Sequence, residues 1–344
     1  MSEFHNKADS QGVFVISLDF ELFWGLRDAR TLEEYGENIL GVRKAIPSLL
    51  DYFVENKIHA TWAVVGFLFF DSKKDLVASL PSLRPTSTDA KLDPYGHIQD
   101  IGEGELDDPY HYGPSLINKI AESPFQEIGT HTFAHFTRWG DGRDEKILVE
   151  DLEAAKRAAA RMGLELKSLV FPRNHFNESC LSACRKVGIE SFRGNKDLFE
   201  WGPMKTLDVN HMINRGKRLF DTYFPFANSR TFDLKSVSES RPYNIPHTRF
   251  LKPYSRRLRF LEPLKIRKIK SDLSCAARKG SIYHIYFHPH NFGVNQKENM
   301  DMFKDIAEHF SGLREKYGMK SMNMMEVAKS AGDYANKKAC TAGG

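Results

Sequence analysis

The sequence predicts an α/β fold built on a parallel sheet or barrel. Short apolar runs of strand length alternate with longer segments of helical periodicity along most of the chain, a pattern typical of βαβ units. The first run, residues 12–20 (GVFVISLDF), is apolar almost throughout, as expected for a strand covered on both faces. With 344 residues, the chain is long enough for a single α/β barrel of about 250 residues with insertions.

The predicted strands combine apolar, β-branched and aromatic residues over a strand-sized length. In chain order they are residues 12–20, 58–65, 126–130, 166–171, 189–193, 281–287 and 319–322. Helical periodicity and helix-ending glycines predict helices at residues 39–55, 113–123, 144–162, 178–187 and 297–316, and from residue 325 onward. Residues 201–249 give no clear pattern, and the basic residues 249–279 are expected to be helical.

These elements are expected to form one domain over residues 12–332. Residues 71–112 are rich in Pro, Ser, Asp and Gly, so they are predicted to be a long insertion that serves as a lid, a binding loop or a disordered insert. The polar residues 1–11 are expected to be a flexible N-terminus, and residues 333–344 a disordered tail. The sequence predicts no oligomeric state.

The composition argues against nucleic-acid binding and against export. Lys and Arg number 49 against 45 Asp and Glu, and the net charge of +4 creates no strong positive field. The polar start lacks the apolar core of a signal peptide, and no run approaches the roughly 18 apolar residues of a membrane span. The cysteines, which contain no C-x-x-C pair, suggest free buried thiols and a cytoplasmic, reducing setting.

Side chains that can bind a metal follow two of the predicted strands. Asp19 and Glu21 stand two residues apart at the end of the first strand, so they point to the same face. His131 and His135 follow the third strand, and they can close on one ion if the chain turns once between them. Two imidazoles, one carboxylate and a water make an open zinc site.

Three further strand ends carry polar groups: Arg173 and Asn174, then Arg193, then His288 and His290. Because sites in α/β folds form at the carboxyl ends of parallel strands, we expect these groups to converge on one site. Each residue taken alone has a simpler interpretation. A strand-end carboxylate is commonly a helix cap or ion-pair partner, and a lone histidine is commonly a hydrogen-bonded polar residue.

Five segments in this order resemble the polysaccharide deacetylases of the NodB-homology type. SLDFE at residues 17–21 resembles the first family motif in its D-x-E variant, and HATWAVVG at residues 59–66 resembles the second family strand. EIGTHTFAHF at residues 127–136 contains the H-[ST]-x-x-H motif, FPRN at residues 171–174 takes the place of R-x-P, and YFHPH at residues 286–290 resembles the closing histidine motif. The matches span most of the chain.

The resemblance implies a distorted (β/α)7 barrel and one divalent metal ion, expected to be Zn²⁺. Glu21, His131 and His135 would be its ligands. Glu21 stands where the family usually has aspartate, which lengthens this ligand by a methylene group. Asp197 is the candidate for the remaining family motif.

The resemblance also implies catalytic roles. Asp19 would be the general base, held in place by Arg173, and His288 would be the general acid. Trp24 could form an apolar wall against a sugar ring or pack in the core. The side chains expected to contact substrate are Trp24, Asn174 and His290.

These residue types suit amide hydrolysis, which needs an activated water and a proton for the departing amine. We expect a hydrolase that removes an N-acyl group, acetyl above all, from a carbohydrate, a nucleotide-sugar or a lipid-linked sugar in surface polysaccharide or lipopolysaccharide assembly. A cyclic amidase or a deformylase on the same fold is the alternative. A mononuclear iron oxygenase or an inactive binding module is more remote, because neither needs both Asp19 and His288.

The basic residues 249–279 allow two interpretations. The first is a solvated helix face, and the second is a surface that attracts the phosphate groups of a nucleotide-sugar or of an anionic membrane. Pro253 and Pro263 argue against one continuous helix lying on a membrane.

Overall fold

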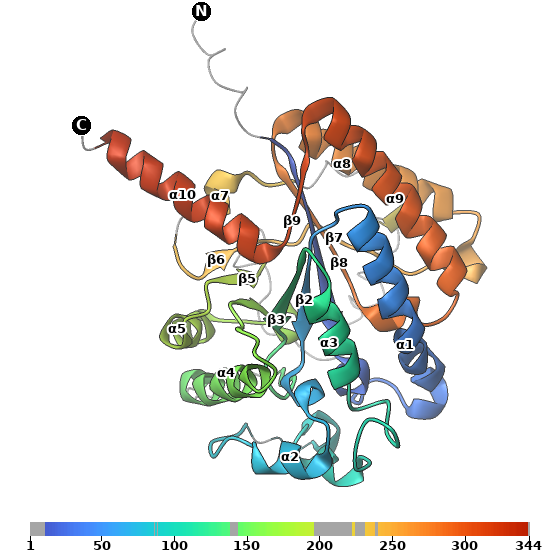
Figure 1. Ribbon diagram of the computed structural model, residues 1–344, viewed down its shortest axis with the longest axis vertical. Coiled ribbons are helices and arrows are strands. Elements are labelled where there is room, and N and C mark those ends of the chain that lie inside the picture. The colour runs from blue at the N-terminus through green and yellow to red at the C-terminus, as the bar shows by residue number, and fades with distance from the viewer. Residues whose placement is uncertain are drawn as a thin grey trace, which may run out of the picture.

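The computed structural model describes residues 11–85, 87, 89–137, 144–195, 222–223, 231–237 and 240–342. In this part of the chain, parallel strands form one sheet in the order β6-β5-β4-β3-β2-β1-β8-β7 (Figure 1). The strands are β1 (Val13–Phe20), β2 (Ala60–Val64), β3 (Gln126–Thr130), β4 (Ser168–Val170), β5 (Ser191–Arg193), β6 (Tyr243–Asn244), β7 (Arg249–Phe250), β8 (Ile282–Phe287) and β9 (Lys320–Met322). All eight residues of β1 are buried, which explains its continuous apolar run.

One extended segment closes this sheet into a distorted (β/α)7 barrel. Residues 243–250 first pair with β5, where Ile245 N donates to Phe192 O at 2.9 Å. The same segment then pairs with β8, where Thr248 N donates to His284 O at 2.8 Å. β6 and β7 therefore share one strand position, and the predicted barrel is confirmed.

The barrel is irregular around β1. β2 pairs with the second half of β1, where Ser17 lies opposite Thr61, whereas β9 pairs with its first half, where Val13 lies opposite Lys320. The last strand therefore fills the place of β2 at the amino end of the barrel.

Helices surround the sheet, with α1 and α3 on one side in this view, α4 and α5 on the opposite side, and α8 and α9 beside β7 and β8 (Figure 1). They are α1 (Leu32–Glu55), α2 (Lys73–Ala78), α3 (Pro114–Glu122), α4 (Asp144–Ala160), α5 (Glu178–Val187), α7 (Leu234–Val237), α8 (Glu262–Lys279), α9 (Gln296–Tyr317) and α10 (Met324–Ala342). Local signals set their ends: Thr31 caps the start of α1 by accepting from Glu34 N, and Gly188 ends α5 with φ of +75°.

Three expectations differ from the structure. The insertion at residues 71–112 contains α2 and short 3-10 helices, and it buries Leu76, Ile98 and Tyr112, so it packs on the domain as an ordered element. α10 continues to Ala342 and so includes most of the expected tail. The basic stretch begins with β7, and its helix starts only at Glu262. Residues 1–10 of the expected flexible N-terminus lie outside the described residues.

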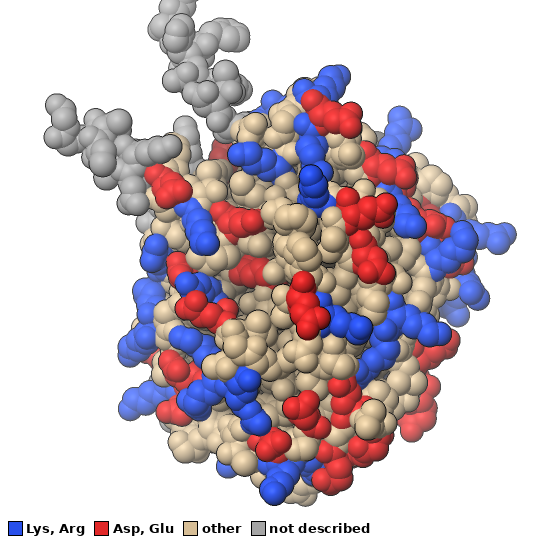
Figure 2. Space-filling view, viewed as in Figure 1, with Lys and Arg blue, Asp and Glu red and all other residues tan. Residues whose placement is uncertain are grey.

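Surface charges are mixed on the face shown in Figure 2, where Lys and Arg alternate with Asp and Glu. Among the described helices, none has the length and apolar character needed to cross a membrane. Cys180, Cys184 and Cys275 are not part of a disulfide, and the first two are buried in the packing of α5, whereas Cys275 is half-buried.

Candidate metal centre and catalytic residues

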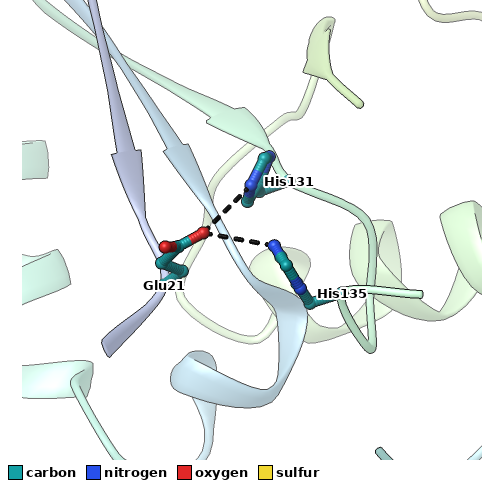
Figure 3. A group of neighbouring side chains, drawn as sticks. All are labelled: Glu21, His131 and His135. Atoms are coloured by element: carbon teal, nitrogen blue, oxygen red, sulfur yellow. Dashed lines mark ion pairs between the residues drawn. The ribbon is translucent and has the colours of Figure 1, made fainter. Parts of the chain in front are cut away.

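Glu21, His131 and His135 meet at the carboxyl end of the barrel (Figure 3). Glu21 follows β1, and both histidines follow β3. Glu21 Oε2 lies 3.3 Å from His131 Nε2 and 3.2 Å from His135 Nε2, and all three side chains are buried. The two histidines therefore approach the same carboxylate oxygen, although the segment between them is a loop and not the helical turn that their spacing suggested.

These three side chains fit a divalent metal ion. Ligand atoms about 2.0–2.1 Å from a tetrahedral zinc ion lie roughly 3.3 Å apart, which matches the distances around Glu21. His131 Nδ1 donates to Val170 O at 2.7 Å, which turns Nε2 toward the carboxylate, and this is the atom that a metal-binding imidazole leaves unprotonated. Two lone pairs facing each other in a buried site repel unless a cation or a proton lies between them. This donor set of two imidazoles and one carboxylate suits Zn²⁺.

The close approach of Glu21 to the backbone depends on Gly25. The 3-10 turn Leu22–Gly25 directly follows Glu21 and brings Gly25 beneath its carboxylate. A Cβ atom at Gly25 would lie 2.1 Å from Glu21 Cδ and 2.3 Å from Oε2. Glycine is therefore needed here to leave room for the longer glutamate ligand.

Asp151 of α4 holds the loop between the two histidines. Its buried carboxylate accepts from Phe133 N at 2.7 Å and from Ala134 N at 3.3 Å. Both ends of this loop are left-handed, with φ of +65° at Thr132 and +54° at His135, so the backbone needs external support. Burial raises the pKa of Asp151 to about 7, although the two backbone N–H groups lower it.

Asp19 is held by Arg193, and the predicted contact with Arg173 is wrong. Arg193 Nη1 donates to Asp19 Oδ1 at 2.6 Å and Nη2 to Oδ2 at 2.7 Å, with both side chains buried. Burial raises the pKa of Asp19, but Arg193 and the neighbouring His131 and His288 outweigh it and hold the pKa at about 2. Asp19 is therefore ionised at neutral pH.

Arg193 is itself fixed from several directions. Its Nη1 also donates to Ser17 Oγ at 3.0 Å, its Nε donates to Asn174 Oδ1 at 3.1 Å, and its guanidinium lies 4.1 Å from the centre of the Tyr286 ring. Asn174 was expected to contact substrate, and the structure instead places its amide oxygen on Arg193. Such a rigid arginine fixes the position of Asp19.

Arg173 lies away from Asp19 and pairs with Asp28. The reason is its backbone: Arg173 has φ of +56° inside a 3-10 turn that begins at Pro172, and this turn directs its side chain to the partly exposed rim. In this chain the arginine follows the proline, whereas it precedes the proline in the family motif. The arginine that binds Asp19 is correspondingly Arg193 and not Arg173.

His288 faces both carboxylates. Its Nε2 lies 3.6 Å from Asp19 Oδ2 and 3.7 Å from Glu21 Oε1, and its side chain is 22% exposed. His290 is buried behind it, with its ring stacked on His288 at 4.9 Å and its Nδ1 3.9 Å from Glu21 Oε1. Burial and the charge of His288 lower the pKa of His290 to about 3, so His290 is neutral.

Trp24 belongs to the core, so its predicted role as a wall against a sugar ring is wrong. The side chain has 0% exposure and packs edge-on against Phe67 at 4.7 Å. Its Nε1 donates to His111 O at 2.8 Å. The core-packing alternative is confirmed.

Sequence reasoning gave no role to Arg193 or Asp151. Arg193 is one of the polar residues at strand ends. Its position at the end of the strand that follows the fourth strand was the signal that could have placed it near Asp19. Asp151 stands inside a charged helical pattern, where nothing in its neighbours distinguishes it from a solvated residue. Asp197, the candidate for the remaining family motif, lies outside the described residues.

The arrangement of the whole chain is similar to that of a solved structure. A candidate polysaccharide deacetylase from Mycobacterium smegmatis matches with a TM-score of 0.59 and 13% sequence identity, over 96% of this chain and 92% of that one. The chain has the polysaccharide deacetylase fold. At this identity the likeness establishes the fold, and it confirms the fold that the sequence motifs implied.

Two other solved structures match this chain with lower TM-scores. A 4-alpha-glucanotransferase from Thermococcus litoralis matches with a TM-score of 0.46 and 13% identity, over 93% of this chain and 40% of that one. A family 4 carbohydrate esterase from Streptomyces lividans in complex with acetate matches with a TM-score of 0.39 and 11% identity, over 88% and 90%. These TM-scores are too low to support a conclusion. No family model and no curated protein matches the sequence.

Proposed function

We propose that this protein is a metal-dependent hydrolase that removes an N-acyl group, acetyl above all, from a carbohydrate. One observation carries the proposal: a carboxylate and two imidazoles suited to a metal lie beside an ionised aspartate and a partly exposed histidine. Amide hydrolysis needs this combination, because the water must lose a proton and the amine must gain one.

Glu21, His131 and His135 would hold the metal ion, taken to be Zn²⁺. When bound, such an ion acidifies a water molecule and polarises the substrate carbonyl. Burial lowers the pKa of His135, which favours the neutral imidazole that a metal requires.

Asp19 would accept the proton of the attacking water. Its carboxylate is ionised because Arg193 binds both oxygens, and this contact also fixes its orientation. A base that is held in place and ionised at the working pH removes a proton without first having to reorganise.

His288 would protonate the nitrogen of the departing amine. Its Nε2 lies near both Asp19 and Glu21, and its side chain is more exposed than either carboxylate. The C–N bond then breaks, and the products are a carboxylic acid and an amine. His290, being neutral and stacked on His288, would keep that ring in place.

The expected substrates are a free carbohydrate, a nucleotide-sugar or a lipid-linked sugar. All three contain a sugar with an N-acyl group, and the proposed reaction takes place at that group. The expected setting, cytoplasmic assembly of surface polysaccharide or lipopolysaccharide, stays a prediction. A cyclic amidase or a deformylase would use the same residues, so the product decides between the functions.

The test is the product released by zinc-loaded protein from a panel of N-acetyl sugars, N-formyl sugars and cyclic amides. We expect acetate from at least one N-acetyl sugar and its loss in Asp19→Asn, which keeps the metal ligands. Release of formate alone, or opening of a cyclic amide alone, would transfer the proposal to the corresponding alternative. No release from any member by metal-loaded protein would contradict it.

A further inference from the structure

An open cavity lies at the same end of the barrel as the candidate metal centre. Its volume is about 560 Å³, within the range of small-molecule sites. Phe250, at the end of β7, lines the cavity, and its ring is 5.6 Å from the ring of His288. A ligand in this cavity would therefore lie next to the proposed acid, on the far side of Phe250.

The cavity is basic and aromatic. Its lining includes Lys252, Arg256 and Arg257 together with Phe250 and Tyr254, and no Asp or Glu is among its described lining residues. Within the part of the chain that the structure describes, Arg256 and Arg257 form no ion pair or hydrogen bond, and both are exposed.

Two lysines of the same basic stretch are used internally instead. Lys265 pairs with Glu262 at 2.6 Å, and Lys268 pairs with Asp272 at 2.7 Å, all four being buried. Arg256 and Arg257 differ from these lysines because they are exposed and line the cavity.

The cavity wall is held in shape by buried polar groups. Lys265 Nζ donates to Lys252 O at 2.9 Å and to Pro253 O at 3.3 Å, and Asn299 Oδ1 accepts from Tyr254 N at 2.7 Å. Lys265 and Asn299 are almost completely buried. The segment that carries the basic groups is thus preorganised before a ligand arrives.

We propose that this cavity binds a phosphate or diphosphate ester of the substrate. The proposal rests on the proposed function and names the substrate class: an N-acyl sugar that carries a phosphate or diphosphate group. Guanidinium groups bind phosphate through paired hydrogen bonds, and the aromatic rings provide flat faces for the adjoining sugar or base. A nucleotide-sugar and a lipid-linked sugar share this chemistry.

Binding of inorganic pyrophosphate, measured by calorimetry, tests the cavity without turnover. We expect the double variant Arg256→Ala/Arg257→Ala to bind about tenfold more weakly than the natural protein. His131→Ala, which removes a metal ligand, should bind as the natural protein does. The opposite pattern would show that pyrophosphate binds the metal and would overturn the proposal, as would the absence of binding at millimolar concentration.

Lys57→Ala/Lys320→Ala is the matched control. These two exposed lysines stand at the amino ends of β2 and β9, and their removal changes the net charge by the same amount. Pyrophosphate affinity should be unchanged in this variant. An equal loss of pyrophosphate affinity in both double variants would show that general electrostatic attraction is responsible, and it would contradict a phosphate site in the cavity.

Turnover separates this inference from the proposed function. Acetate release is compared for N-acetylglucosamine, its 1-phosphate, its uridine-diphosphate ester and its polyprenyl-diphosphate ester. We expect kcat/KM to be higher for the esters than for the plain sugar. In Arg256→Ala/Arg257→Ala, kcat/KM for the esters should fall toward the value for the plain sugar. The best ester identifies the source of the phosphate. Equal kcat/KM for all four substrates would contradict the phosphate site and leave the proposed hydrolase activity standing. Binding of pyrophosphate without release of acetate from any substrate would support the phosphate site and contradict the hydrolase activity.

Discussion

Arg193 binds Asp19 through two parallel hydrogen bonds, and both side chains are almost fully buried. The arginine comes from β5 and the aspartate from β1, so the contact crosses the barrel between strands that are not neighbours. Ser17 and Asn174 also accept from this guanidinium. The ionisation of the proposed base therefore depends on a residue that lies 174 positions away in the sequence.

Arg193→Met is expected to move the acid limb of the pH profile. In the natural protein the pKa of Asp19 is about 2, so Asp19 remains ionised throughout the range in which activity is measured. Without the arginine, burial dominates and raises the pKa of Asp19, so activity should fall at a higher pH than in the natural protein. The profile of kcat/KM against pH checks this. Arg173→Met is the control, and an equal shift in both variants would contradict the assignment.

Gly25→Ala is expected to fold and to bind zinc at least about tenfold more weakly. The new Cβ would collide with the carboxylate of Glu21, a side chain that can swing away from its place beside the histidines. Loss of one ligand weakens the site without removing any core contact. Zinc titration and thermal unfolding of the metal-free protein check the two parts. Unchanged zinc affinity would show that Glu21 is not held there.

Asp151→Asn is expected to remove a pH dependence of stability. The pKa of Asp151 is about 7 in the folded protein against an ordinary value of 3.8, so the folded state favours the protonated acid. This contribution is fully present below about pH 4 and is lost as the pH rises through 7, by at most about 4 kcal/mol. The asparagine does not titrate.

Unfolding by urea of the metal-free proteins at several pH values measures this difference. The free energy of unfolding of the natural protein, minus that of the variant, should fall between pH 4 and pH 8. A difference that is flat with pH would mean that burial does not raise the pKa of the Asp151 carboxyl as described.

His288→Gln is expected to lower kcat by about 10²- to 10⁴-fold while the zinc content stays the same. The effect should shrink for substrates with a more acidic leaving group, because a good leaving group needs less protonation. Substrates of graded leaving-group pKa check this. An undiminished loss across that series would assign His288 to binding.

The sequence was sufficient to locate most strands along the chain and the polar groups at their ends. Continuous apolar runs such as residues 12–20 leave few alternatives to a buried parallel strand, and the carboxyl ends of such strands meet. The closing segment at residues 243–250 was not recognised, because two very short pairings with different strands give no periodic pattern.

Contacts between side chains were harder to predict than their location. The family motif points to Arg173, yet its left-handed backbone turns it to the rim, and Arg193 reaches Asp19 from β5, the strand beside β4. Trp24 follows the metal ligand by three residues, but its depth was set by the insertion that packs over it through His111. Such outcomes depend on tertiary packing, which local sequence does not encode.

The metal centre is tested by the zinc content of four proteins after loading and gel filtration. We expect about one ion per chain in the natural protein and in Asp19→Asn, and little or none in Glu21→Ala and His131→Ala. Equal zinc in all four would contradict a metal centre at these side chains. Loss of zinc in Asp19→Asn with retention in Glu21→Ala would show that the two carboxylates have the opposite roles.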